Sequence, residues 1–178
     1  MSLIRRLLDR LILIATVVAG GLVPGFIAQY RQRLGGRLDQ AKLDLDPWKK
    51  MADQLFGGDL DKLIQYHLDS RDPIFHADGV AIRNIADAVQ HLQTAVEALQ
   101  TSLLQQVAYL TMHLDTNLAH ATWADWVPTF ALSAEGITFA LLFALSIWLL
   151  FHALWLLVAK STARLRHRRH RAVGARPA

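Results

Sequence analysis

The sequence predicts an all-α membrane protein in which two transmembrane helices flank a helical domain. Two apolar runs carry this prediction, one at residues 11–29 and the other at residues 136–159. Each run has about the 20 residues that a helix needs to cross a hydrocarbon layer of about 30 Å. The segment between them, residues 30–135, is polar and shows the three-to-four-residue apolar spacing of helices, whereas strand patterns are almost absent.

Charge is divided unevenly along the chain. The formal net charge is +4, yet residues 30–135 carry nine Lys and Arg against fourteen Asp and Glu. This central segment is therefore mildly acidic. It shows no basic stripe with interleaved aromatic residues, so we expect no nucleic acid partner. The partners that we expect are the lipid bilayer and either a second copy of the chain or another envelope protein.

Lys and Arg near the span ends predict the orientation, because these residues collect on the cytoplasmic side of a membrane. Three Arg lie on each side of the first span, so this span does not decide the orientation. Basic residues crowd the chain after the second span, and none lies between Asn84 and Glu135. We therefore predict an inner-membrane protein with residues 1–10 and 160–178 in the cytoplasm and residues 30–135 in the periplasm.

A cleaved secretory signal is an alternative for the first span. The chain begins with a basic stretch and an apolar run, and Val17-Val18-Ala19 ahead of Gly20 loosely resembles a cleavage site. Apolar residues continue to Ile27, as in a retained anchor, so we predict that the span is kept. The absence of cysteine does not distinguish an exported domain from a cytosolic one.

Small residues four apart predict how the spans pack, because helices in lipid associate through close backbone approach. The two small-residue faces could meet in a hairpin, or each could serve a homodimer. Pro24 is predicted to kink or end the first helix near its outer edge, since proline removes an intrahelical donor. The packing positions are Ala15, Ala19, Gly21 and Gly25 in the first span and Gly136, Ala140 and Ala144 in the second.

His152 is the ionisable side chain within the two spans. An ionisable group inside a membrane is a candidate functional site. At 1.5 Å per residue, however, His152 lies only about 10 Å from the cytoplasmic end of its span. The other span offers no acidic partner for a proton relay, so we interpret His152 as a structural or interfacial residue.

Start and stop signals predict two helices in the first part of the central segment. One covers approximately Leu38–Phe56, with a possible break at Asp46-Pro47, where Asp caps and Pro opens a helix. Gly57-Gly58 ends this helix. Asp59 is the predicted N-cap of a short helix that extends through Leu68.

The longest predicted element follows a turn-rich stretch at residues 69–73. It opens at Asp78-Gly79 and runs to about Ala121, and its apolar residues alternate three and four apart as in a coiled coil. A shift of register after Leu103 is a stutter, which locally unwinds a coiled coil. The helix either dimerises or packs on the two shorter helices of its own chain, and we favour the second. The seam residues are Ile82, Ile85, Val89, Leu92, Val96, Leu99 and Leu103.

Catalytic motifs are absent from the sequence. A chain without cysteine has no thiol nucleophile, and no Gly-x-Ser-x-Gly, phosphate loop or His-Glu-x-x-His occurs. We therefore predict a non-enzyme without catalytic, cofactor-binding or metal sites. Two groups of polar residues could be taken for metal or active sites, but we interpret them otherwise. Caps and turns explain the first group, and a polar stripe on a helix explains the second. They are His67, Asp69, Asp72, His76 and Asp78, and His113, Asn117 and His120.

Several junction motifs resemble those of a known family. They are Pro24–Phe26 running into Gln29–Gly36, the Asp72-Pro73 turn, Ala121–Pro128, and Leu132–Gly136 leading into the second span. Together they resemble a bacterial family of two-span membrane proteins known as domain-of-unknown-function family 2937. The resemblance covers nearly the whole chain. It implies membrane location and topology and supplies no activity.

Conspicuous residues flank both spans where the chain enters the central domain. We predict that they form one junction at the outer membrane interface, where Tyr and Trp rings lie at headgroup level. Arg31 would reach lipid phosphate or Asp125. The predicted function is a structural or interaction component that acts through its periplasmic helices; the alternative is an accessory subunit of a membrane transporter. The junction residues are Gln29, Tyr30, Arg31, Trp123, Trp126 and Pro128.

Overall fold

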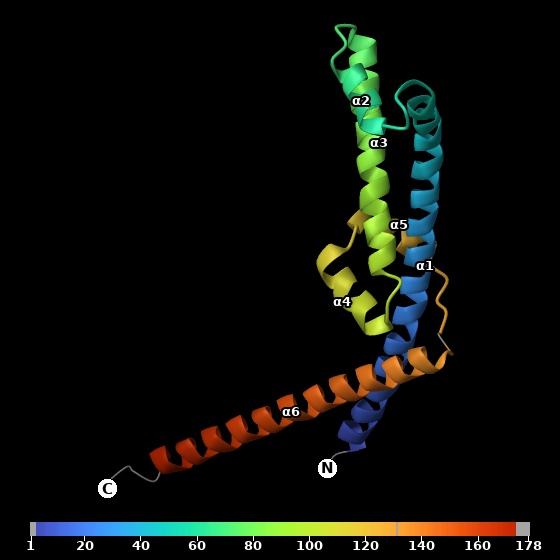
Figure 1. The fold of residues 1–178 in the computed structure, drawn as a ribbon. Helices are drawn as coiled ribbons and strands as arrows, with labels where there is room; N and C mark the ends of the chain where they lie inside the picture. The colour runs from blue at the N-terminus through green and yellow to red at the C-terminus, as the bar shows by residue number, and fades with distance from the viewer. Residues whose placement is uncertain (1–2, 131, 174–178) are drawn as a thin grey trace. The chain divides into compact units, whose positions relative to one another are not determined.

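The computed structural model describes residues 3–130 and 132–173, with side chains described from residue 7 to residue 155 apart from residue 131. In these residues the chain forms six helices and no strand (Figure 1). The predicted all-α fold class is therefore confirmed. The basic tail predicted at residues 160–178 lies outside the residues whose side chains are described. The helices are α1 Leu3–Leu55, α2 Leu60–Leu68, α3 Pro73–Ala98, α4 Leu103–His113, α5 Thr116–Ala124 and α6 Ala134–Val173.

The chain divides into two compact units. Unit 1 comprises residues 1–25 and 129–178, and unit 2 comprises residues 26–128. α1 and α6 are each long and apolar enough to cross a membrane by length and composition. The helical content and the two apolar helices agree with the coarse architecture that the sequence predicts.

The core of unit 2 lies between α1, α2 and α3. Leu38 and Leu45 of α1 pack with Ile64 of α2 and with Ile82 and Val89 of α3. α3 runs beside the part of α1 that belongs to unit 2, and α2 packs on α3 (Figure 1). The seam residues of α3 thus pack within their own chain, the arrangement that we favoured over a coiled-coil dimer.

The short helix α2 has the predicted boundaries. Gly57 and Gly58 end the preceding turn with φ of 65° and 86°, a left-handed conformation that glycine adopts without a steric penalty. The Asp59 carboxylate accepts a hydrogen bond from the Lys62 backbone N–H at 3.0 Å. This bond is the main cause of the lowered pKa of Asp59, because it stabilises the ionised form of the cap.

The breaks expected in α1 are absent. Pro24 does not end or interrupt the helix, and the helix predicted at residues 38–56 is the continuation of the same element through Pro47. A proline inside a helix costs about 3 kcal/mol. This cost is offset by burial of apolar side chains near each proline. Ile27 after Pro24 is 3% exposed, and Leu45 before Pro47 is 2% exposed.

The single long helix expected at residues 79–121 was wrong, because three helices replace it. α3 starts earlier, at Pro73, where the Asp72 side chain accepts from the Ile74 backbone N–H at 2.8 Å. The helix then ends at Ala98, and Leu99 is its C-cap. Ser102 and Gln105 form a capping box that starts α4, and Asp115 caps α5. Each cap satisfies backbone donors that a continuous helix would satisfy internally.

Candidate functional site

An aromatic cluster holds the α5 end of unit 2 against α1. The Phe26 ring lies 6.1 Å from the Trp123 ring and 5.9 Å from the Trp126 ring, with the second pair edge to face. The two tryptophan rings are 4.9 Å apart. Contacts of this type contribute about 0.5–1.5 kcal/mol each beyond the area that they bury. Both tryptophans belong to the predicted junction, whereas Phe26 was not predicted to be part of it.

Two polar contacts extend this cluster. The Gln29 side-chain amide donates to the Val127 carbonyl at 3.0 Å. The Arg33 guanidinium lies 2.7 Å from the Asp125 carboxylate. The Asp125 side chain is 72% exposed, so water screens the pair and it contributes at most about 1 kcal/mol. These contacts fix the register between α1 and the segment that follows α5.

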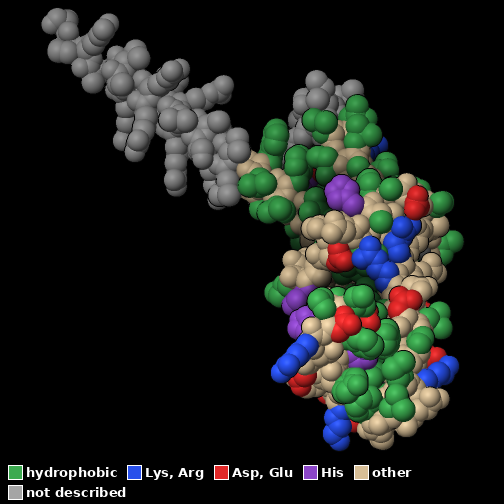
Figure 2. All heavy atoms as spheres, turned by 90° about the horizontal axis from the view of Figure 1, so that it is seen from above, with side chains coloured by type: hydrophobic (Ala, Val, Ile, Leu, Met, Phe, Trp, Pro, Cys, Tyr) green, Lys and Arg blue, Asp and Glu red, His purple; other side chains and the backbone are tan. Residues whose placement is uncertain are grey.

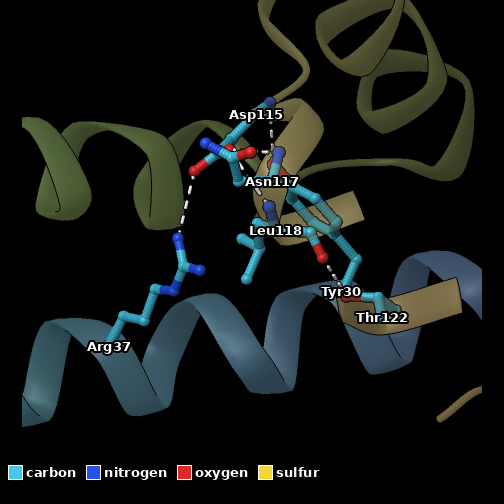
Figure 3. Close-up of polar contacts among 6 residues, drawn as sticks. All are labelled: Tyr30, Arg37, Asp115, Asn117, Leu118 and Thr122. Carbon is cyan, nitrogen blue, oxygen red and sulfur yellow. Dashed lines mark hydrogen bonds and ion pairs between the residues drawn. The ribbon is translucent and has the colours of Figure 1, made fainter. Parts of the chain in front are cut away.

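A second polar group centres on Asp115, the N-cap of α5 (Figure 3). Its carboxylate accepts from the backbone N–H groups of Asn117 and Leu118 at 2.9 and 3.0 Å. Its backbone N–H donates to the Tyr30 hydroxyl at 3.3 Å, and Arg37 approaches the carboxylate to 3.1 Å. One aspartate therefore both starts α5 and attaches it to α1. Tyr30 is buried, so this link lies inside unit 2.

The structure places Arg31 and Pro128 outside these contacts. Arg33 takes the Asp125 contact that we expected for Arg31, which is exposed. At 3.6 residues per turn, Arg31 lies about 200° around the axis of α1 from Gln29, so the two side chains are on opposite sides of the helix. Arg31 instead lines an open hollow with Gln32 and Gln100. Pro128 is exposed at the end of unit 2. The spacing of Phe26, Gln29, Tyr30, Arg33 and Arg37 is three or four residues, a signal that could have identified the contact face from sequence.

The small residues of unit 1 fall into two groups. A Cβ added at Gly20 would lie 3.1 Å from the Ala140 Cα, and one added at Gly21 or Gly25 would overlap Phe130 or Thr129. Gly21 and Gly25 of α1 therefore leave no room for a Cβ, whereas a Cβ at Gly20 would need its α6 neighbours to move by only a few tenths of an ångström. Within the set predicted to pack, Gly21, Gly25, Gly136, Ala140 and Ala144 are buried, whereas Ala15 and Ala19 are exposed.

A family model described as "Protein of unknown function (DUF2937)" matches residues 4–164. The chain belongs to this family. The match covers the junction residues and both apolar runs, and it confirms the family resemblance seen in the sequence. No curated protein and no solved structure matches the chain.

In this member of the DUF2937 family, His152 has an acidic neighbour that the sequence analysis overlooked. The Asp9 carboxylate accepts a hydrogen bond from the Trp148 indole N–H at 3.1 Å and lies 3.9 Å from His152 Nδ1. Asp9 precedes the predicted span by two residues, and α1 already includes it. The predicted span itself contains no acidic residue, as expected, but Asp9 just outside it lies close to His152.

In the first of the two other polar groups, three side chains have local partners in caps and turns. Asp72 caps α3, the Asp69 carboxylate accepts from Gln65 at 2.7 Å, and His76 Nδ1 lies 2.7 Å from the Leu68 carbonyl. Among the described residues no group of three or more His, Cys, Asp or Glu side chains could hold a metal ion. The expected stripe of His113, Asn117 and His120 on one helix is also wrong, because His113 ends α4 and the other two belong to α5.

The Tyr30 hydroxyl provides a test of the α1–α5 attachment. We expect Tyr30→Phe to lower the free energy of unfolding by about 1 kcal/mol, because the Asp115 N–H loses its acceptor. Thermal melts of the full chain followed by circular dichroism would measure this loss. The matched control is Tyr66→Phe, since Tyr66 is 63% exposed. Equal melting temperatures for the two variants would mean that the hydroxyl contributes nothing to the attachment.

Proposed function

We propose that the chain is an integral protein of the bacterial inner membrane, which it spans with the apolar parts of α1 and α6. The observation that carries this proposal is the exposure of apolar side chains on both helices: Ile14 is 61% exposed and Leu141 is 58% exposed. Leaving such a side chain in water costs about 1.5–3 kcal/mol relative to burying it. A bilayer would cover this surface, whereas a soluble core helix would already be covered.

The proposed orientation has both termini in the cytoplasm and residues 30–135 in the periplasm. It rests on the Lys and Arg residues after the second apolar run and on their absence between Asn84 and Glu135. The native chain has no cysteine, so single introduced thiols can report the side of each segment.

We expect Arg71→Cys to react with a membrane-impermeant maleimide in intact spheroplasts, because Arg71 is exposed between α2 and α3. A cysteine appended after Ala178 should react only after the membrane is opened by detergent. Both cysteine variants should sediment with the membrane fraction and should not be extracted by carbonate. Labelling of the appended cysteine in intact spheroplasts, or protection of Arg71→Cys, would contradict the orientation.

Unit 2 is proposed to act as an interaction module rather than as an enzyme. The supporting observation is an exposed apolar surface, here called the end patch, in which Leu55, Tyr66 and Phe75 line one hollow and Ile74 directly precedes Phe75 in the chain. Their exposed fractions run from 46% to 72%. They come from the C-terminal end of α1, from α2 and from the start of α3. Contiguous exposed apolar surface of this kind marks interaction sites.

A photo-crosslinking amino acid at Ile74 tests this role in cells. We expect it to yield a defined adduct with an envelope protein or with a second copy of the chain. The control position is Gln90, which is exposed on α3 outside the end patch. If Ile74 gives no adduct, or no more than Gln90, the end patch is not the interaction surface.

An accessory subunit of a membrane transporter is the second candidate. Ala15 and Ala19 lie four residues apart on α1, and both are exposed. This small-residue face remains open for a helix of a larger membrane partner. Under this alternative the crosslinker gives adducts from Ala15 and none from Ile74.

A further inference from the structure

A hollow within the end patch lies between the C-terminal part of α1, α2 and the first turns of α3, and Leu55, Tyr66 and Phe75 of the patch line it. Its volume is about 560 Å³, within the range of about 300–1,000 Å³ that is usual for small-molecule sites. Figure 2 shows hydrophobic side chains gathered among acidic and basic ones on the face that it views. The lining includes four aromatic side chains, one histidine and one carboxylate: Trp48, Phe56, Tyr66, Phe75, His67 and Asp78.

His67 holds the aromatic rings of the hollow in place. Its ring is edge to face with Trp48 at 5.9 Å and 86°, and with Tyr66 at 6.0 Å and 80°. The Phe75 ring lies 5.5 Å away on a tilted plane. His67 is only 6% exposed, and its Nδ1 has no hydrogen-bond partner in the part of the chain that the structure describes. Buried polar atoms without a partner are uncommon, and each one calls for an explanation such as a bound water, an ion or a functional role.

The charges around the hollow are of one sign. Asp78 lines it, and a second hollow of about 330 Å³ shares Tyr66 and Phe75 and has Asp69 in its wall. Neither Lys nor Arg is among the described residues that line either hollow. The faces of aromatic rings carry negative potential and attract cations. The site is therefore apolar and electronegative, which is complementary to a cation that carries alkyl groups.

We propose that this hollow binds a small organic ammonium ion, with its alkyl groups against the aromatic rings and its charge facing Asp78. Tyr66 and Phe75 line both hollows, and each hollow has a carboxylate in its wall, so we assign their rings as the principal contacts. A neutral apolar molecule of the same shape would fit but would lose the attraction to the rings and to the carboxylate.

The source of the ion is a dissolved solute rather than a lipid headgroup. Trp48 follows Gln29 by nineteen residues along α1. At 1.5 Å per residue this places the hollow about 28 Å along the helix from the end of the span. This step rests on the proposed function, because it takes residues 11–29 to be inside the membrane.

The test compares choline with 3,3-dimethyl-1-butanol, a neutral molecule in which carbon replaces the ammonium nitrogen. The full chain is purified in a non-ionic detergent, and binding is measured by calorimetry and by saturation-transfer NMR of the methyl protons. We expect choline to bind between about threefold and thirtyfold more tightly than the neutral isostere. Equal binding of both would mean an apolar slot suited to a hydrophobic peptide, and would overturn the proposal. So would no binding of choline at millimolar concentrations.

Two variants locate the site. Tyr66→Leu removes a ring from an exposed position, and Asp78→Asn removes the charge; each should reduce the preference for choline at least threefold. The matched control is Tyr109→Leu, because Tyr109 lies on α4 outside the hollow. Circular dichroism melts confirm that the variants fold. A preference unchanged in both variants would place choline elsewhere and overturn the proposal. Membrane orientation and cellular partners play no part in this measurement, so its failure would leave the proposed function standing.

Discussion

Ile82→Asp is expected to destabilise unit 2 strongly. The Ile82 side chain is 0% exposed and packs in the cluster that joins α1, α2 and α3. An aspartate at this position would bury a charge without a partner, and it would also remove the apolar contacts. We expect a loss of about 3–5 kcal/mol, a large share of the 5–15 kcal/mol that stabilises a typical domain.

Thermal melts of the full chain in detergent would measure this loss. For a unit of this size the melting temperature should fall by roughly 12 °C or more. The matched control is Val80→Asp, which makes a similar chemical change two residues earlier at a side chain that is 43% exposed. Equal melts for the two variants would mean that Ile82 does not lie in a packed core.

The same comparison ranks the residues of the predicted seam. Ile82 and Leu99 are fully buried, whereas Leu92 and Val96 are only half-buried. Charges at Leu92 or Val96 should therefore cost less than a charge at Ile82. The spacing of apolar residues identified the face of α3 that packs, because a period of 3.6 residues defines one side of a helix. It could not rank the positions, since burial depends on which part of α1 or α2 lies opposite.

Short sequence signals predicted where individual helices start and end. The length of the helix expected at residues 79–121 was not predicted correctly. Asp59 and Gly57-Gly58 set the start of α2 and the end of the preceding turn, because caps and left-handed glycines act over a few residues. The predicted long helix failed where Ser102 and Asp115 start new helices. The stutter after Leu103 marked the right region, but heptad spacing alone does not distinguish an unwound coil from a chain that stops and turns back.

Several residues of the predicted junction take part in contacts between α1 and the chain near α5. Trp123 and Trp126 contact Phe26, Gln29 donates to the Val127 carbonyl, and the Tyr30 hydroxyl accepts from the Asp115 N–H. The charged partner is Arg33 rather than Arg31. Which arginine reaches Asp125 depends on how α1 is rotated about its own axis. The packing of the whole unit sets that rotation, and local sequence signals do not reveal it.

A disulfide between cysteines at positions 20 and 140 is the other large effect that we expect. A Cβ at Gly20 would lie 3.1 Å from the Ala140 Cα, and Ala140 already carries a Cβ on a buried face of α6. A disulfide tolerates Cα separations of about 4.4–6.8 Å and Cβ separations of about 3.5–4.5 Å. The chain has no cysteine of its own, so Gly20→Cys/Ala140→Cys contains the only two thiols.

Oxidation of the double variant should convert most of the chain into an internally linked form that migrates faster on non-reducing gels. The matched control is Ala19→Cys/Leu141→Cys, which moves both thiols by one residue to exposed positions and should give no internal link. Links between chains in the 20/140 variant would mean that α6 packs on α1 of a second copy. Links between chains in the control alone would assign the exposed Ala15 and Ala19 face to self-association. If the 20/140 thiols remain reactive and unlinked, α6 does not pack on α1 through Gly20, and the close approach within unit 1 is wrong.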